Sequence, residues 1–142
     1  MAFTLCLQER VPFFTSGMIV DIFTDLLRGA SSDCSVRTLY CFMPEHVHAI
    51  VMGTNENSDA LHSMELFKQT SGWWLKTNRS DVKWQKSFHD RIARSTEELA
   101  ALSRYLVNNP VRRGLVKNWV DYPFTGAIGL VLEEFLTDLM PF

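Results

Sequence analysis

Two histidines one residue apart, His46 and His48, lie in the apolar stretch "CFMPEHVHAIVMG" at residues 41–53. In a β-strand, residues i and i+2 point to the same face of the sheet, so both imidazoles are expected to face one way. Neutral imidazole nitrogens bind divalent metals, but two such ligands do not by themselves make a firm site. The pair therefore predicts either part of a metal centre or two partly buried polar residues whose hydrogen bonds are satisfied by neighbours.

A second pair, Tyr105 and Asn109, lies four residues apart in "LSRYLVNNPVRRGLV". Side chains at this spacing are neighbours on one face of a helix. Because Asn109 precedes Pro110 at the expected helix end, its amide oxygen can turn toward a metal ion. The alternative interpretation makes Asn109 a plain C-terminal cap and Tyr105 an aromatic of the core, which is the commoner fate of both residue types.

The elements in the first half of the chain follow from the pattern of apolar residues. Residues 2–10 alternate as a strand does, and residues 17–28 have helical spacing, with Gly29 as an end signal. Residues 35–43 and 46–53 are typical of two strands joined by a tight hairpin. The two histidines therefore begin the third strand.

The second half predicts helices and short strands. Residues 58–77 are expected to form a helix, and residues 82–94 two short strands. Residues 95–109 form the clearest helix of the chain, ended by Pro110. Residues from about 127 to 140 are typical of a final amphipathic helix.

The predicted element order is β-α-β-β-α-β-β-α-α in a single domain spanning residues 1–142, with a core at about 3–126 and a C-terminal helix at about 127–140. This order favours an α+β sandwich of the ferredoxin or RRM type. We expect a mostly antiparallel sheet with the helices packed on one face.

The composition argues against several classes of protein. The chain has 142 residues, 46% of them hydrophobic and 21% charged, which is typical of a folded globular protein. Its net charge of -2 argues against a global field that attracts nucleic acid, although a local basic patch remains compatible. The cysteines show no CxxC spacing, so neither a disulfide framework nor a zinc ribbon is indicated. With no secretory signal and no apolar run of membrane-spanning length, we expect a soluble, cytoplasmic protein that contacts no membrane.

Three sequence blocks together carry a family resemblance. The blocks are "FMPEHVHAIV", "WQKSFHDRIAR" and "YLVNNPVRRGLV...DYPFTG", and they are more specific together than H-x-H alone. They resemble the HUH tyrosine transposases of the insertion sequence 200/605 type, in particular the REP-associated tyrosine transposases. The match runs from about Phe3 to Gly126, with the blocks in the family's order. One departure is Glu45, which stands where the family commonly has Asn or Asp.

The resemblance implies a role for each of four residues. His46, His48 and Asn109 would bind Mg²⁺ or Mn²⁺, and Tyr105 would be the nucleophile. A tyrosine hydroxyl is a poor nucleophile at neutral pH, so the phosphate that it attacks must be made electrophilic, which a divalent ion does. The reaction would leave a 5'-phosphotyrosine link and a free 3'-hydroxyl, and rejoining would need no ATP.

The resemblance also implies a single-stranded or hairpin DNA partner. Basic side chains near the second helix and around the tyrosine helix can contact its phosphates, although solvated surface charge is the plainer interpretation for any one of them. These candidates are Lys68, Lys76, Arg79, Arg91, Arg94, Arg104, Arg112 and Arg113. His89, in the second block, can be structural or a phosphate contact. Whether the protein is a monomer or a homodimer stays open.

The preferred hypothesis is a metal-dependent endonuclease and strand transferase of DNA transposition and recombination. A rival is a hairpin-binding module or repressor that keeps the fold without turnover. A third hypothesis is an unrelated metal hydrolase built on His46 and His48, in which Tyr105 is structural. The rivals differ in whether they turn over DNA and whether a covalent protein–DNA adduct forms.

Overall fold

A five-stranded antiparallel sheet with strand order β4-β1-β3-β2-β5 forms the centre of the molecule. The computed structural model describes residues 1–139. Its elements in chain order are β1 (Ala2–Cys6), a 3-10 turn (Gln8–Arg10), α1 (Gly17–Asp33), β2 (Val36–Met43), β3 (His46–Gly53), α2 (Ala60–Asn78), β4 (His89–Arg91), α3 (Thr96–Arg112), a 3-10 turn (Trp119–Asp121), β5 (Thr125–Ile128) and α4 (Leu132–Leu139). The predicted α+β class and antiparallel sheet are confirmed.

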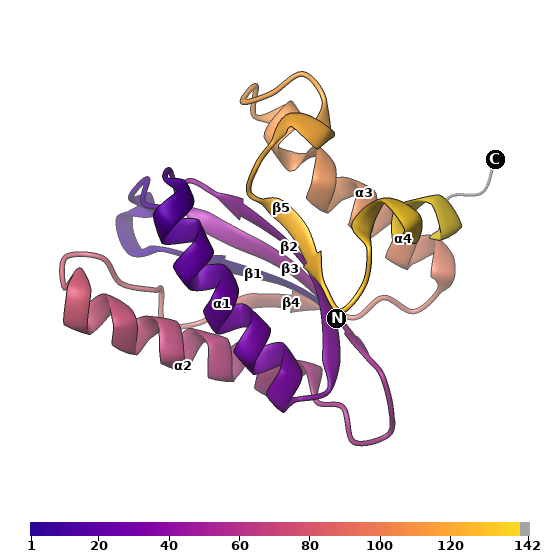
Figure 1. Cartoon of the computed structure of the whole chain (residues 1–142), viewed down its shortest axis with the longest axis horizontal. Coiled ribbons are helices and arrows are strands. Elements are labelled where there is room, and N and C mark those ends of the chain that lie inside the picture. The colour runs from indigo at the N-terminus through magenta and orange to yellow at the C-terminus, as the bar shows by residue number, and fades with distance from the viewer. Residues whose placement is uncertain (140–142) are drawn as a thin grey trace.

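Helices cover both faces of this sheet. Figure 1 shows α1 and α2 on one side and α3 and α4 on the other. The expectation that the helices pack on one face is therefore wrong. The reason lies in β2 and β3, whose residues are buried on both faces, so each face needs its own apolar cover.

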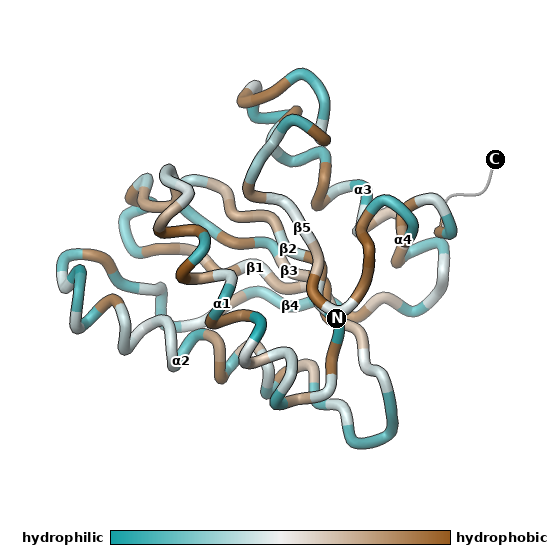
Figure 2. Tube along the Cα trace, viewed as in Figure 1, coloured by the Kyte–Doolittle hydropathy of each residue, from teal (hydrophilic) through white to brown (hydrophobic). Residues whose placement is uncertain are grey.

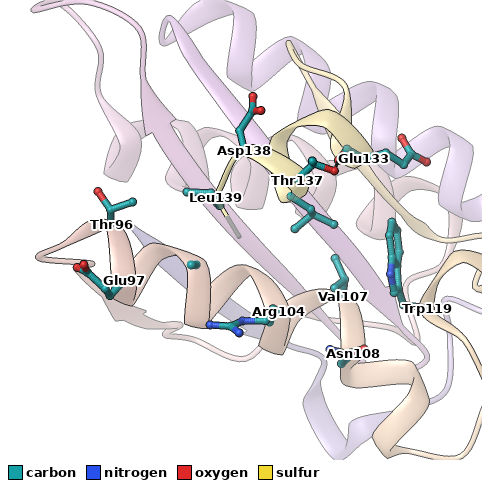
Figure 3. Close-up of a pocket in the computed structure, with 12 residues that line it drawn as sticks. Thr96, Glu97, Arg104, Val107, Asn108, Trp119, Glu133, Thr137, Asp138 and Leu139 are labelled. Carbon is teal, nitrogen blue, oxygen red and sulfur yellow. Dashed lines mark hydrogen bonds between the residues drawn. The ribbon is translucent and has the colours of Figure 1, made fainter. Parts of the chain in front are cut away.

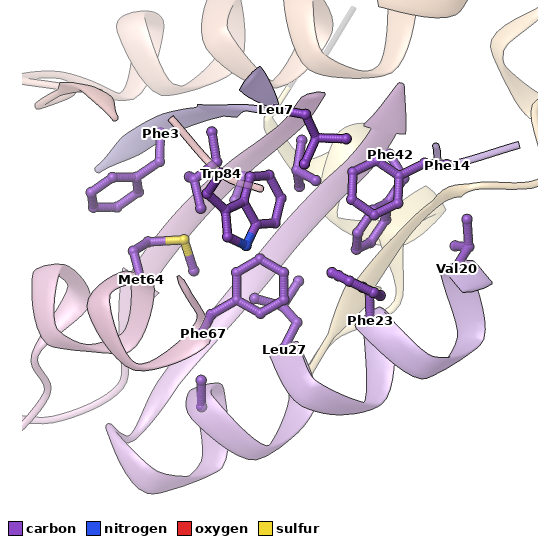
Figure 4. Packing of buried hydrophobic residues seen from close by; sticks show 14 of the residues in the cluster. Phe3, Leu7, Phe14, Val20, Phe23, Leu27, Phe42, Met64, Phe67 and Trp84 are labelled. Atoms are coloured by element: carbon purple, nitrogen blue, oxygen red, sulfur yellow. The ribbon is translucent and has the colours of Figure 1, made fainter. Parts of the chain in front are cut away.

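The core under α1 and α2 is rich in aromatic side chains. Phe14 is fully buried and meets Phe23, Phe42 and Trp84 at ring-centroid distances of 5.1, 5.2 and 5.9 Å (Figure 4). The indole N–H of Trp84 donates to Ser71 Oγ at 2.9 Å, so the ring's one polar atom is satisfied inside the core. This packing holds both helices against the sheet. In Figure 2, brown and teal segments alternate along α1, as expected for a helix with one buried face.

A second core lies between the sheet and α3 with α4. Side chains of β2 and β3 that point away from α1, among them Leu39, Met43 and Ile50, pack against Leu106 and Leu136. The tyrosine helix is thereby fixed on the face of β3 that carries His46 and His48.

Two predicted helix ends are wrong because tertiary contacts outweigh local signals. Helix α1 continues through Gly29 to Asp33, since the next turn faces the sheet and Ser31 Oγ lies 2.8 Å from Thr38 Oγ1. Helix α3 includes Pro110 and ends at Arg112. The proline gives up one backbone hydrogen bond, but its side chain is buried.

Two strand predictions also differ from the structure. Residues 82–94 contain only β4 and an isolated bridge between Leu7 and Trp84, in place of two strands. Residues 125–128, partly assigned to the final helix, form β5 beside β2, and α4 starts only at Leu132. The ring of Tyr40 lies over Gly126, where any Cβ would collide with it. The predicted last helical residue, Met140, lies outside the described residues.

Membrane insertion of a helix finds no support in the described part of the chain. Between residues 1 and 139, every helix is too short or too polar to cross a bilayer.

The aromatic core makes a stability prediction. Replacing Phe14 with Ala should lower the free energy of unfolding by about 3–5 kcal/mol, because it leaves a cavity among rings that cannot collapse fully. Urea unfolding followed by circular dichroism measures the change. Met18→Ala is the control, since Met18 lies in the first turn of α1, is 74% exposed, and should cost under about 0.5 kcal/mol. Equal costs for the two variants would contradict the packing described.

Candidate active site

His46 and His48 point to the same face of β3 and their rings meet. The two Nε2 atoms lie 3.0 Å apart, with the ring planes at 82°. Val47, between them, is buried in the opposite core. The predicted same-face arrangement is therefore present, and it results from strand alternation alone.

Each ring is oriented from behind by a partner at Nδ1. Glu45 Oε1 accepts from His46 Nδ1 at 3.0 Å, and Thr4 Oγ1 lies 3.1 Å from His48 Nδ1. A carboxylate at Nδ1 fixes the proton there and leaves the lone pair of His46 on Nε2. The Nε2 atoms are the ones turned toward α3.

Asn109 completes the group from α3. Its side chain is buried, and its amide Nδ2 lies 2.5 Å from His48 Nε2. The alternative of Asn109 as a plain helix cap does not describe this position, because the amide points at the histidine from inside the last helical turn.

This donor set fits a divalent ion. Two ligands at neighbouring positions of an octahedral ion, with bonds of about 2.1 Å, lie about 3.0 Å apart, which is also the separation of the two Nε2 atoms. With Nδ1 of His46 donating to Glu45, Nε2 of His46 presents a lone pair toward His48, and this is the atom that would bind a cation. Within residues 1–139 no three His, Cys, Asp or Glu side chains cluster as a metal site, so the third donor here would be an amide.

Tyr105 stands beside these donors. Its ring lies 6.0 Å from that of His48, edge to face at 84°, and its side chain is 52% exposed. The guanidinium carbon of Arg112 lies 3.7 Å from the centre of the tyrosine ring. A tyrosine that is half exposed and lies beside candidate metal ligands is accessible to a substrate phosphate.

The other two tyrosines are in different positions. Tyr122 is buried and its hydroxyl donates to the carbonyl of Phe42 at 2.6 Å, and burial raises its pKa. Burial also raises the pKa of Tyr40, whose ring lies over Gly126. Tyr105 is thus the tyrosine of this chain best placed to act as a nucleophile.

Glu45 is held by two arginines as well as by His46. Arg113 donates to its carboxylate at 2.7 Å, and Arg10 lies 3.8 Å away. Burial by itself would raise the pKa of Glu45, but the Arg113 hydrogen bond and the charges of His46 and Arg113 outweigh it, so the pKa lies below its usual value. The carboxylate that orients His46 is therefore charged at neutral pH.

Both imidazoles are neutral at neutral pH. Burial lowers the pKa of His46, and Glu45 offsets this only in part. Burial, followed by the positive charges of His46 and Arg112, lowers the pKa of His48 to about 3. Neutral imidazole is the form that binds metals.

His89 lies on the same face of the sheet as the candidate ligands. Thr4 of β1 pairs with His48 on one side and with His89 of β4 on the other, so the three side chains form a row. His89, His48 and Tyr105 line one cavity of about 200 Å³. His89 is thus next to the group without contacting its Nε2 atoms.

The basic residues proposed as DNA contacts are divided by the fold. Arg112 and Arg113 lie at the candidate site, and Arg91 lines the cavity that Tyr105 shares.

The other basic candidates lie away from the site. Helix α2 and its C-terminal end, on the opposite face of the sheet, carry Lys68, Lys76 and Arg79. Arg79 pairs with Asp81. Arg94 precedes α3, where its backbone N–H donates to Glu98. Arg104 lies in a groove between α3 and α4 (Figure 3).

Three positioning residues were not assigned a role from the sequence. Thr4, Glu45 and Arg10 hold the two imidazoles directly or through another side chain. Strand alternation places Thr4 on the face of β1 opposite to Phe3 and Leu5. Its pairing with His48 of β3, however, has no local signal in the sequence.

The ion pair of Glu45 makes a pH-dependent prediction. Because the folded-state pKa of Glu45 is depressed, its contribution to stability is present above the unfolded value of about 4.3 and is lost as the pH falls through the folded pKa. Arg113→Met should cost about 1–2 kcal/mol at pH 7, since Glu45 is buried but Arg113 is half exposed. The cost should shrink below about pH 4. Urea unfolding at both pH values tests this, with Arg104→Met as the control; an unchanged cost at low pH would contradict it.

Known proteins that are similar to this chain agree with the family resemblance of its sequence blocks. No family model matches the chain. A protein of Haemophilus influenzae described as "Putative REP-associated tyrosine transposase" is 24% identical, over 87% of this chain and 76% of that protein. A solved structure described as a REP-associated tyrosine transposase bound to a REP hairpin matches with a TM-score of 0.63 at 21% identity, over 87% of this chain and 73% of the other. Over most of its length, the chain is therefore similar in sequence and in fold to REP-associated tyrosine transposases, as its three sequence blocks indicated.

Proposed function

We propose that this protein cleaves and rejoins single-stranded or hairpin DNA through a covalent link to Tyr105, with Mg²⁺ or Mn²⁺ as cofactor. The observation that carries the proposal is the position of Tyr105 beside His48, whose Nε2 meets His46 and Asn109. A nucleophile next to three convergent neutral donors is the arrangement that metal-assisted phosphoryl transfer needs.

The comparisons support the substrate class. The similar solved structure is described as bound to a REP hairpin, and the similar curated protein as a tyrosine transposase. We infer that this chain also acts on DNA that carries a hairpin, in transposition or on repeated palindromes.

His46, His48 and Asn109 would hold the ion. Both imidazoles are neutral, and their Nδ1 partners turn the Nε2 lone pairs toward the same point. A half-turn of the Asn109 amide exchanges Nδ2 for the oxygen, which is the atom a hard divalent cation prefers. When bound, the ion would polarise the phosphate and stabilise the charge that develops on its oxygens.

Tyr105 supplies the covalent chemistry. Its hydroxyl oxygen attacks the phosphorus of a phosphodiester, the bond from phosphorus to the 3'-oxygen breaks, and the phenolic proton is replaced at the free 3'-hydroxyl through solvent. The products are a 5'-phosphotyrosine and a 3'-hydroxyl end, and the reverse attack rejoins the strand. Because His46, His48 and Asn109 are neutral ligands, they would leave the charge of a bound ion available to the phosphate.

The proposed function predicts that Tyr105 is the nucleophile. Incubation of the protein with labelled single-stranded hairpin DNA and Mn²⁺ should give a protein-linked DNA band on a denaturing gel. Tyr105→Phe should abolish the band while hairpin affinity changes less than about twofold, because the exposed ring keeps its contacts. Tyr40→Phe is a matched control that removes a hydroxyl elsewhere and should keep the band.

The rival functions give different results in the same assay. Hairpin binding with no adduct and no cleavage in the wild-type protein would favour a binding module or repressor. Metal-dependent cleavage without an adduct, unaffected by Tyr105→Phe, would favour a metal hydrolase.

The proposed function also makes a prediction about Glu45, whose carboxylate accepts from His46 Nδ1. Glu45→Gln should raise the Kd for Mn²⁺ about 10–100-fold, since the amide weakens the orientation and basicity of the imidazole. The free Mn²⁺ signal in electron paramagnetic resonance measures Kd. Glu97→Gln, an exposed change in the first turn of α3, is the control and should leave Kd unchanged. A wild-type protein that binds no Mn²⁺ would overturn the metal proposal.

A further inference from the structure

Arg112 makes the closest cation–π contact of the described residues. Its guanidinium carbon lies 3.7 Å from the ring centre of Tyr105, whereas the other three such contacts span 5.3–5.7 Å. At 3.7 Å a planar guanidinium is stacked on the ring. Tyr105 is half exposed, and this contact and the contact with His48 both restrain its ring.

The stacking is set by the helix. Tyr105, Asn109 and Arg112 follow one another at spacings of four and three residues on α3, and so share one face. The candidate nucleophile, the candidate third ligand and the arginine are therefore carried by one rigid element. Arg113, the next residue, turns away to Glu45.

The charge of Arg112 is not used by another side chain. Among residues 1–139 its guanidinium has no ion-pair or hydrogen-bond partner, whereas Arg113 is paired with Glu45. Guanidinium carries five N–H donors in a planar fork that matches phosphate oxygens. While its face covers the ring of Tyr105, its N–H groups have no partner among the described residues.

We propose that Arg112 is a catalytic residue of the reaction inferred above: it stacks on Tyr105 to hold the nucleophile and donates to the phosphate that Tyr105 attacks. The proposal rests on the proposed function. Tyr105 oxygen forms its bond to phosphorus as the 3'-oxygen leaves, and Arg112 stabilises the charge on the non-bridging oxygens without exchanging a proton. The same contact would hold the 5'-phosphotyrosine for the return attack.

The test is the single-turnover rate of adduct formation at saturating hairpin DNA, where differences in affinity no longer matter. Arg112→Met should lower this rate about 100-fold or more, as the loss of one oxyanion donor does. Arg112→Lys should recover only part of it, because a point charge lacks the planar fork. Millimolar methylguanidinium should accelerate Arg112→Ala and leave Tyr105→Phe inactive.

Arg28→Met is the matched control, because Arg28 lies on α1, which covers the opposite face of the sheet, and pairs with Asp25. It should leave the saturated rate unchanged. If Arg112→Met only weakens hairpin binding and reacts at the wild-type rate at saturation, Arg112 is a backbone contact and the proposal is wrong.

The stacking itself has a readout that does not depend on activity. The δ protons of Arg112 should show an upfield ring-current shift in NMR spectra, and Tyr105→Leu should remove it. An adduct with the wild-type protein and no such shift would overturn this inference alone. A wild-type protein that forms no adduct would overturn the proposed function and the catalytic role together, whatever the shift.

Discussion

The alternation of side chains along β3 sets which residues enter each core and which face the candidate site. This central strand has neighbours on both edges and an apolar layer on both faces. Val47 and Ala49 pack under α1 and α2, which forces His46 and His48 to the other face. A polar pair at least partly buried on that face needs polar partners, which Glu45 of the turn, Thr4 of β1 and Asn109 of α3 supply.

The turn between β2 and β3 joins that strand to the tyrosine helix. Glu45 is buried in this turn, and a buried carboxylate is costly unless it is paired. His46, Arg10 and Arg113 offset the cost, and because Arg113 caps α3, the same contacts fix the helix relative to the strand. Glu45 therefore adds no unpaired negative charge near the proposed phosphate position.

Local charge at the candidate site differs from the charge of the whole chain. The net charge is -2, yet Arg112 and Arg113 extend from the end of α3 and Arg91 lines the adjoining cavity. One of these charges is neutralised by Glu45, and that of Arg112 remains available. One arginine without an acidic partner at the candidate site would attract a phosphate there, without a general attraction of the whole protein to nucleic acid.

The elements with strong local periods could be predicted from the sequence: the β2–β3 hairpin, the same-face histidines, and the helix with Tyr105 and Asn109. Three sequence blocks also carried the transposase resemblance. Which faces pack together, in contrast, depends on tertiary contacts. The contacts of His48 with Thr4 and Asn109 join residues 44 and 61 positions apart, and β5 exists because β2 offers it an edge. Periodicity is a local property, whereas these pairings follow from burying both faces of one sheet.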